Sequence, residues 1–242
     1  MNYEQKVKTG ISDVGKNGRI TNKAILTILE NIGAYQSDIA GQGVLDMEKT
    51  GVSWIILDWK LKVLKRPLYG EEVLVKTWGR NNKRVHTYRD FEVYNENEEL
   101  CIIATTKMAL INIDTKKLLK LDDELMKKYK MDEKSVFEAT ELDKIKIPEE
   151  YTSKKEYEIT RKYIDYNGHM HNTYYIDLAY EAMPDEVYEN RPYNNVRINY
   201  RNEIKLGDIV SCNYAYFDKK HVIVIKNVSE NIVNSVIELW ND

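Results

Sequence analysis

The residues best suited to chemistry lie between Asp165 and Asn172. Asp165, Asn167 and His169 alternate along the chain, so in an extended segment their three side chains would leave the same face. An imidazole titrates near neutral pH and suits a general base, while an amide can hold a carbonyl group or a water molecule without titrating. A nearby carboxylate can orient the imidazole or attack as a nucleophile. The pattern predicts a site for proton transfer or nucleophilic attack.

A helix is expected to begin at Asn172, run to about Met183 and end before Pro184. The first N–H groups of a helix have no partner inside it and carry partial positive charge. A carbonyl group docked over Asn172 would therefore be polarised, and an oxyanion formed from it would be stabilised. Asn172 is thus a candidate oxyanion position close to His169.

Two other interpretations of these residues stay open. His169 and His171 can belong to a solvated turn that caps the helix and does no chemistry. They are also metal-ligand types, and Asp165 could add a third ligand, but no further His or Cys lies nearby to complete a tetrahedral site. We therefore expect neither a metal nor another cofactor.

An earlier segment shares the frame of this stretch but not its chemistry. Residues 17–22 align with residues 167–172, and both segments run into a helical pattern. This alignment places Arg19 on His169, so the imidazole is present in the second segment only.

A second pair of segments also aligns. Residues 66–71 match residues 203–208, and each segment precedes an apolar run. Glu203 stands where the first segment has Arg66, which adds a candidate carboxylate to the second set. Because self-similarity indicates a repeated structural unit, we predict one unit used twice, with the ionisable set in the second copy only.

Each copy is expected to contain a strand, one long helix and a meander of strands. The clearest helix spans residues 22–35, with Gly33 as a candidate end. A sheet that curls around such a helix buries its apolar face, so we expect an α+β fold of two antiparallel sheets, each wrapped around a central helix. The expected strands of the meanders are Val52–Leu64, Glu72–Trp78, His86–Tyr94 and Leu100–Ile113, then Asn195–Tyr200, Ile209–Phe217, His221–Val228 and Ile232–Trp240, with Glu156–Arg161 opening the second copy.

The length and composition fit two globular domains. We expect a first domain over residues 1–130, a linker over 131–155 and a second domain over 156–242. The net charge of −3 gives no general attraction to nucleic acid or to a membrane, and no apolar run is long enough to span a bilayer. The N-terminus lacks the features of a signal or transit peptide, so we expect a cytoplasmic protein.

The chain resembles the acyl-acyl-carrier-protein thioesterases, the enzymes that end fatty-acid synthesis by hydrolysing the acyl thioester. The second domain of that family carries an Asp-x-Asn-x-His-x-x-Asn motif at the start of its central helix and an acidic residue in a Tyr-Arg-x-Glu context. The matching residues are Asp165, Asn167, His169, Asn172, Tyr200, Arg201 and Glu203. The resemblance covers nearly the whole chain and implies tandem hotdog domains with a catalytic second domain.

One departure from the family narrows the choice of catalytic nucleophile. Plant members have a cysteine directly after the acidic residue, where this chain has Ile204. Cys101 and Cys212 align with no catalytic position, so a cysteine nucleophile is excluded, and their separate contexts predict no disulfide. The missing plant-type transit segment suggests a bacterial member.

The resemblance also implies the partners. The substrate would be a fatty acyl chain carried on acyl carrier protein, with the chain held in an apolar pocket of the first domain. Plain core packing is the competing explanation for each candidate pocket residue. The candidates are Ile25, Ile28, Leu29, Ile32, Trp54, Ile56 and Met108.

Other functions share this fold. A thioesterase for coenzyme A esters, another hotdog enzyme such as a dehydratase, and a non-catalytic acyl-binding protein are the alternatives. The sequence leaves the acyl chain length and the oligomeric state open, with a homodimer as one option.

Overall fold

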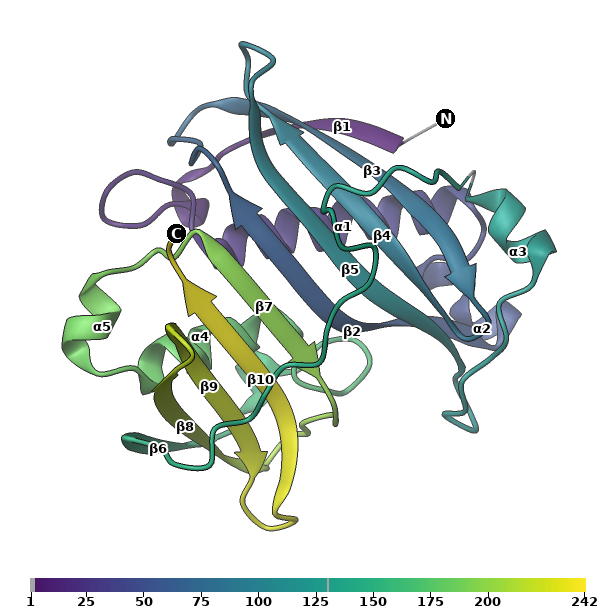
Figure 1. Cartoon of the computed structure of the whole chain (residues 1–242). Coiled ribbons are helices and arrows are strands. Elements are labelled where there is room, and N and C mark those ends of the chain that lie inside the picture. Colours follow the sequence, from purple (N-terminus) through teal and green to yellow (C-terminus); the bar gives the residue numbers. More distant parts are fainter. Residues whose placement is uncertain (1–2, 130) are drawn as a thin grey trace. The chain divides into compact units, whose positions relative to one another are not determined.

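The computed structural model describes residues 3–129 and 131–242, with all their side chains except those of residues 81–83. The chain forms two compact units, unit 1 up to Leu142 and unit 2 from Asp143. In each unit an antiparallel sheet packs against one main helix, as Figure 1 shows. The expected arrangement of a sheet around a central helix is therefore present twice.

The strands of unit 1 lie in the order β1-β3-β4-β5-β2, and every neighbouring pair is antiparallel. The strands are β1 (Tyr3–Lys8), β2 (Val52–Val63), β3 (Glu72–Lys83), β4 (His86–Tyr94) and β5 (Leu100–Asn112). The helical segments are η1 (Ile11–Asp13), α1 (Asn22–Ile39), η2 (Val44–Asp46), α2 (Met47–Thr50) and α3 (Asp123–Lys128).

Helix α1 supplies the core of unit 1. Ile25, Leu29 and Ile32 recur at the helical period and are at most 2% exposed. The inner face of the sheet offers Trp59 and Phe91, whose ring centroids lie 5.5 Å apart and which are 1% exposed. Burying each of Ile25, Leu29 and Ile32 contributes about 1.5–3 kcal/mol to the stability of the fold. This apolar stripe therefore fixes which side of α1 faces the sheet.

The sequence predicted Gly33 as a candidate end of α1, but the helix continues to Ile39. A Cβ atom at Gly33 would lie 3.3 Å from Cδ of Arg89 on the neighbouring sheet. The glycine is therefore a point of close approach between helix and sheet rather than a helix stop.

The strands of unit 2 lie in the order β7-β10-β9-β8-β6, again antiparallel throughout. They are β6 (Ser153–Glu158), β7 (Asn195–Tyr200), β8 (Ile209–Phe217), β9 (Lys220–Asn227) and β10 (Ile232–Trp240). The helical segments are η3 (Arg161–Tyr163), α4 (Tyr174–Ala182) and α5 (Asp185–Glu189).

Helix α4 packs against this sheet through small and apolar residues. Ile176, Ala179 and Ala182 are fully buried and form the face that α4 turns toward the sheet. The two alanines let the sheet approach the helix backbone closely. The helix is shorter than expected, because it begins two residues after Asn172 and is followed at Met183 by extended backbone.

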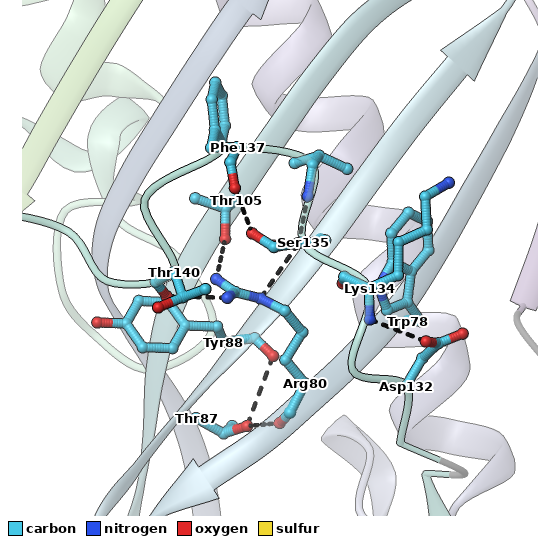
Figure 2. Close-up of polar contacts among 12 residues, drawn as sticks. Trp78, Arg80, Thr87, Tyr88, Thr105, Asp132, Lys134, Ser135, Phe137 and Thr140 are labelled. Carbon is cyan, nitrogen blue, oxygen red and sulfur yellow. Dashed lines mark hydrogen bonds and ion pairs between the residues drawn. The ribbon is translucent and has the colours of Figure 1, made fainter.

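The segment predicted as a linker, residues 131–155, is attached to both units in turn. The N–H of Asp132 donates to the carbonyl of Gly79 (2.9 Å), and the indole N–H of Trp78 donates to the carbonyl of Lys134 (2.8 Å). Figure 2 shows this part of the segment on the outer face of the unit 1 sheet. From residue 143 the chain packs on unit 2, with Ile145 buried in a cluster of sheet valines.

A buried ion pair anchors the same segment. Nε of Arg80 lies 3.1 Å from Oδ2 of Asp90, and the two side chains are 8% and 0% exposed. Nη1 of Arg80 also donates to the carbonyl of Thr140 (2.8 Å), and Oδ2 of Asp90 accepts from the N–H of Val136 (3.0 Å). Both charges are therefore compensated where the segment covers the sheet.

Candidate active site

The segment that carries His169 folds as a tight turn. The N–H of Asp165 donates to the carbonyl of His169 (2.9 Å), and the N–H of Gly168 donates to the carbonyl of Asp165 (3.1 Å). Gly168 has a φ of 80°, in the left-handed region that glycine enters at little cost. The extended segment that would put Asp165, Asn167 and His169 on one face is therefore absent here, because the chain reverses direction between them.

The carboxylate of Asp165 holds this turn together. Its Oδ1 accepts from the N–H of Asn167 (2.8 Å) and of His169 (3.3 Å). Within residues 131–242 it makes no hydrogen bond to the imidazole, so it positions His169 through the backbone. Asn167 is exposed at the tip of the turn.

His169 and Glu203 are brought together by backbone pairing of their segments. His169 forms a bridge with Lys205, and the N–H of Met170 donates to the carbonyl of Ile204 (2.8 Å). Nε2 of His169 then lies 2.9 Å from Oε2 of Glu203, with the side chains 20% and 50% exposed. Because an ionised carboxylate only accepts hydrogen bonds, Nε2 carries the proton, and a neutral ring leaves Nδ1 as an acceptor. The pair is open to solvent and has a proton-accepting atom available.

The start of α4 lies next in the chain. The N–H groups of Tyr174 and Tyr175 donate to the carbonyls of His171 (3.0 Å) and Asn172 (3.3 Å), which form a turn before the helix. Thr173 is the N-cap residue, and its side chain does not cap the helix. Among the described residues, the N–H groups of Asn172 and Thr173 have no acceptor. Such free N–H groups suit an oxygen atom that is developing negative charge.

Unit 1 repeats the backbone frame of this site. The N–H of Gly15 donates to the carbonyl of Arg19 (3.0 Å), and the N–H of Ile20 donates to the carbonyl of Pro67 (3.0 Å). Gly18 has a φ of 68° at the corresponding place in the turn. The predicted duplication is therefore confirmed by matching hydrogen bonds in the two units.

Unit 1 fills the corresponding position with its own side chains. Nη1 of Arg66 donates to the carbonyl of Ile20 (2.9 Å), and Nη2 donates to Oδ1 of Asn22 (2.7 Å). Oγ1 of Thr21 accepts from the N–H of Ala24 (3.2 Å) and caps α1. The protein itself thus closes the tip of α1, whereas the tip of α4 stays open.

Family comparison agrees with this division into halves. The family model for the acyl-ACP thioesterase N-terminal domain matches residues 1–129, and the model for the acyl-ACP thioesterase C-terminal domain matches residues 145–242. The chain belongs to the acyl-ACP thioesterase family. The expected family resemblance is therefore confirmed over both units.

Plant proteins are among the curated relatives of this acyl-ACP thioesterase family member. Oleoyl-acyl carrier protein thioesterase 1 of Arabidopsis thaliana is 24% identical over 227 residues, which cover 87% of this chain and 62% of the relative. Dodecanoyl-[acyl-carrier-protein] hydrolase of Cinnamomum camphora is 25% identical over 221 residues, which cover 82% and 55%. The chain thus spans about three fifths of the length of the first of these relatives.

Solved structures show the same fold. An acyl-ACP thioesterase from Bacteroides thetaiotaomicron matches with a TM-score of 0.87 and 21% identity, over 99% of this chain and 97% of that chain. The 12:0-ACP thioesterase from Umbellularia californica matches with a TM-score of 0.86 and 17% identity, over 99% and 96%. The predicted tandem hotdog fold is confirmed.

The residues predicted to line an acyl pocket separate into two groups. Trp54 and Met108 border a small recess in unit 1. The others do not border this recess: Ile25, Leu29 and Ile32 lie in the core, and Ile28 and Ile56 are half-buried.

Two tyrosines beside the acyl-ACP thioesterase motif are absent from the predicted site. The hydroxyl of Tyr200 donates to the carbonyl of Asn172 (3.0 Å), and its ring centroid lies 5.1 Å from that of Tyr175. Burial, together with the carboxylates of Glu203 and Asp165, raises the pKa of Tyr175 well above its usual range. Tyr200 could have been found from its Tyr-Arg-x-Glu context, whereas Tyr175 occupies a helical face that otherwise takes apolar residues.

The cysteines are unsuited to nucleophilic catalysis. Cys101 and Cys212 are free and buried, and burial raises the pKa of the Cys212 thiol to about 12. In the described ranges, no group of three His, Cys, Asp or Glu side chains is arranged to hold a metal ion. No helix among the described residues is long and apolar enough to cross a membrane.

Proposed function

We propose that this chain hydrolyses the thioester of fatty acyl-acyl carrier protein, which releases a free fatty acid and ends chain elongation. Family membership and the names of the relatives, which include an oleoyl- and a dodecanoyl-carrier-protein hydrolase, support this substrate class. The observation that carries the proposal is the His169–Glu203 pair beside the open tip of α4, which unit 1 replaces with two arginines.

The reaction starts with the thioester carbonyl over the start of α4, where the N–H groups of Asn172 and Thr173 donate to its oxygen. A water molecule attacks the carbonyl carbon and gives one proton to the His169–Glu203 pair. The new C–O bond converts the carbonyl oxygen to an oxyanion. When this intermediate collapses, the C–S bond breaks, and the sulfur leaves with the bonding electrons and takes the proton back from the pair. The products are the fatty acid and the free thiol of the carrier.

Each polar residue of the turn has a role in this scheme. Nδ1 of His169 or the second carboxylate oxygen of Glu203 accepts the proton from water. The exposed amide of Asn167 holds the carbonyl group or the water. Asp165 positions the turn, and because its Oδ1 already accepts two N–H groups, attack by water is favoured over attack by this carboxylate.

The remaining partners follow from the same proposal. We place the acyl chain in unit 1, whose recess is bordered by Trp54 and Met108. Acyl carrier protein is acidic, and the exposed Arg161 and Lys162 of η3 directly precede the catalytic turn, so we expect it to dock there. We expect a cytoplasmic protein, and a homodimer is the assembly to test first.

The test measures thiol release from matched carrier-protein and coenzyme A thioesters. We expect release from the carrier-protein thioester, lowered about 10²–10⁴-fold by His169→Ala. Arg19→Ala changes the corresponding residue of unit 1 and should leave turnover unchanged. Thiol release from the coenzyme A ester alone would show that the substrate is a coenzyme A thioester. Release from neither ester would favour a non-catalytic acyl-binding protein.

A further inference from the structure

A bulge in β10 lies against the loop that carries Glu203. The ladder between β9 and β10 skips Asn234, which is the extra residue between Val233 and Ser235. Asn234 is 0% exposed. Strand β7 ends at Tyr200, and the next three residues run past this bulge. A buried amide therefore lies where the chain leaves the sheet for the candidate site.

Asn234 holds this loop with both its backbone and its side chain. Its carbonyl accepts from the N–H groups of Arg201 (2.8 Å) and Asn202 (3.3 Å). Its Nδ2 donates to the carbonyls of Asn202 (3.3 Å) and Glu203 (3.1 Å). One buried residue is thus hydrogen-bonded to three successive loop residues, and the last of them is Glu203.

Unit 1 repeats the backbone half of this arrangement. The ladder between β4 and β5 skips Cys101 in the same way. The carbonyl of Cys101 accepts from the N–H groups of Leu64 (2.8 Å) and Lys65 (3.0 Å). These two residues directly precede Arg66, as the corresponding two residues of unit 2 precede Glu203. Cys101 is therefore the counterpart of Asn234.

The side chains at the two bulges make different contacts. Sγ of Cys101 donates to the carbonyl of Glu99, two residues earlier in the chain (3.4 Å). Nδ2 of Asn234 instead reaches across to the carbonyl of Glu203. Because the bulge forms around a thiol in unit 1, its backbone does not require an amide. The amide adds a hold on the Glu203 backbone, in the unit that has the candidate site.

Glu203 depends on such a hold more than its counterpart does. Arg66 is 8% exposed, and its guanidinium anchors itself on the carbonyl of Ile20 and on Oδ1 of Asn22. The side chain of Glu203 is 50% exposed, although its Oε2 lies 2.9 Å from Nε2 of His169. The place of a half-exposed carboxylate is set largely by the backbone that carries it.

We propose that Asn234 is a positioning residue that keeps the carboxylate of Glu203 at His169. The inference rests on the proposed function and deepens it, because it adds a buried residue of the sheet to the control of the acid–base pair. The amide holds the Glu203 carbonyl, and the backbone then holds the carboxylate. Misplacing a catalytic group by about 1 Å can cost about 10²-fold in rate, so a residue that does not touch the substrate can control kcat.

The test replaces Asn234 by Cys, the residue that occupies the bulge of unit 1. Asn213→Cys is the matched control, because Nδ2 of buried Asn213 donates to the carbonyls of Ser211 (3.1 Å) and Val224 (3.0 Å) within the same sheet. Both variants lose amide hydrogen bonds to two carbonyls, and both should lose unfolding free energy. Only Asn234→Cys should lower kcat, by about 10–10²-fold with KM unchanged.

A second background separates positioning from general damage to the fold. In Glu203→Gln, the carboxylate that Asn234 positions is already gone, so adding Asn234→Cys should lower kcat further by less than about twofold. Equal losses of kcat in Asn234→Cys and Asn213→Cys would overturn the inference. The full loss of kcat on adding Asn234→Cys to Glu203→Gln would overturn it as well.

Amide hydrogen exchange tests the same inference without turnover. The N–H of Met170 donates to the carbonyl of Ile204, so its exchange rate, measured by NMR, reports whether the Glu203 loop stays on the catalytic turn. We expect faster exchange in Asn234→Cys than in the control, and equal exchange would reject the inference. If the wild type hydrolyses no thioester, the proposed function fails and this measurement decides alone. If Asn234→Cys does not fold, Asn234→Ser, which also lacks the amide, replaces it in every comparison.

Discussion

Nε2 of His169 lies 2.9 Å from Oε2 of Glu203, although one residue belongs to a turn before α4 and the other to the loop after β7. Unit 1 has Arg19 and Arg66 at the corresponding positions, and Nη1 of Arg19 donates to the carbonyl of Arg66 (3.5 Å). Two guanidinium groups cannot exchange a proton near neutral pH. The same backbone frame therefore holds an acid–base pair in unit 2 and cations that close a helix tip in unit 1.

Replacing Glu203 by Gln should lower turnover without unfolding the protein. The amide oxygen can still accept from Nε2 of His169, but it no longer stabilises a protonated imidazole or accepts a proton itself. We expect kcat to fall about 10²–10⁴-fold. Because half of the Glu203 side chain is exposed, the free energy of unfolding should change by less than about 0.5 kcal/mol. Steady-state kinetics and denaturation check both values, with the exposed Glu158→Gln as control; wild-type kcat in Glu203→Gln would remove the carboxylate from the mechanism.

Tyr200→Phe should uncouple a catalytic effect from a stability effect. The lost hydroxyl donates to the carbonyl of Asn172 at the tip of α4, whereas the hydroxyl of Tyr193 donates to the carbonyl of Val187 (2.7 Å). Each Tyr→Phe change removes the hydrogen bond just named, and this loss should cost about 1 kcal/mol of unfolding free energy. Only Tyr200→Phe should lower kcat, because it loosens the free N–H groups there. Equal loss of kcat in both variants would contradict a positioning role for Tyr200.

Met108→Trp should shorten the acyl chain that the protein prefers. Met108 borders the recess, so a larger side chain there fills space that the chain end would occupy. Leu29 is 0% exposed in the core, so Leu29→Trp should instead lower the unfolding free energy by about 1–3 kcal/mol through overpacking. A chain-length panel and denaturation of both variants separate these effects. An unchanged chain-length profile for Met108→Trp would place the chain end elsewhere.

His221 should make unit 2 less stable in mild acid. Its Nδ1 lies 2.9 Å from the hydroxyl of Tyr214, and burial lowers the pKa of the imidazole. At pH values between the lowered pKa of folded His221 and the ordinary pKa of about 6.5, the imidazole is protonated in the unfolded chain but neutral in the folded chain. The stabilisation is thus fully present above about pH 6.5 and is lost as the pH falls below it. His221→Gln should reduce the difference in unfolding free energy between about pH 8 and about pH 5.5, and an equal difference in both proteins would exclude His221 as the cause.

The frame of the candidate site could be predicted because it depends on local residues. Gly18 and Gly168 occupy matching positions with a positive φ, so the alignment of residues 17–22 with residues 167–172 matched the two segments before any long-range contact was known. The pairing of His169 with Glu203 followed from the family motif. Its distance depended on backbone bonds between segments far apart in the sequence, such as that from Met170 to Ile204.

Other features could not be predicted because tertiary contacts override local signals. Gly33 resembles a helix stop, yet it serves the close approach of Arg89. Residues 131–142 are rich in charge and resemble a linker, but their backbone groups find partners such as Trp78 and Arg80 on a sheet face.

The closed tip of α1 lets the proposed protein divide two tasks, catalysis and the accommodation of the acyl chain, which a single-copy protein would have to combine in one unit. Unit 1 keeps the shared turn but holds Arg66 against Asn22 at the position where unit 2 has His169 and Glu203. The interior of unit 1 therefore does not have to maintain the geometry of a catalytic pair. Its side chains can be resized or recharged to suit a different cargo while the machinery of the other half stays untouched. Under the proposed function, tailoring such a protein to new feedstocks should therefore begin in unit 1.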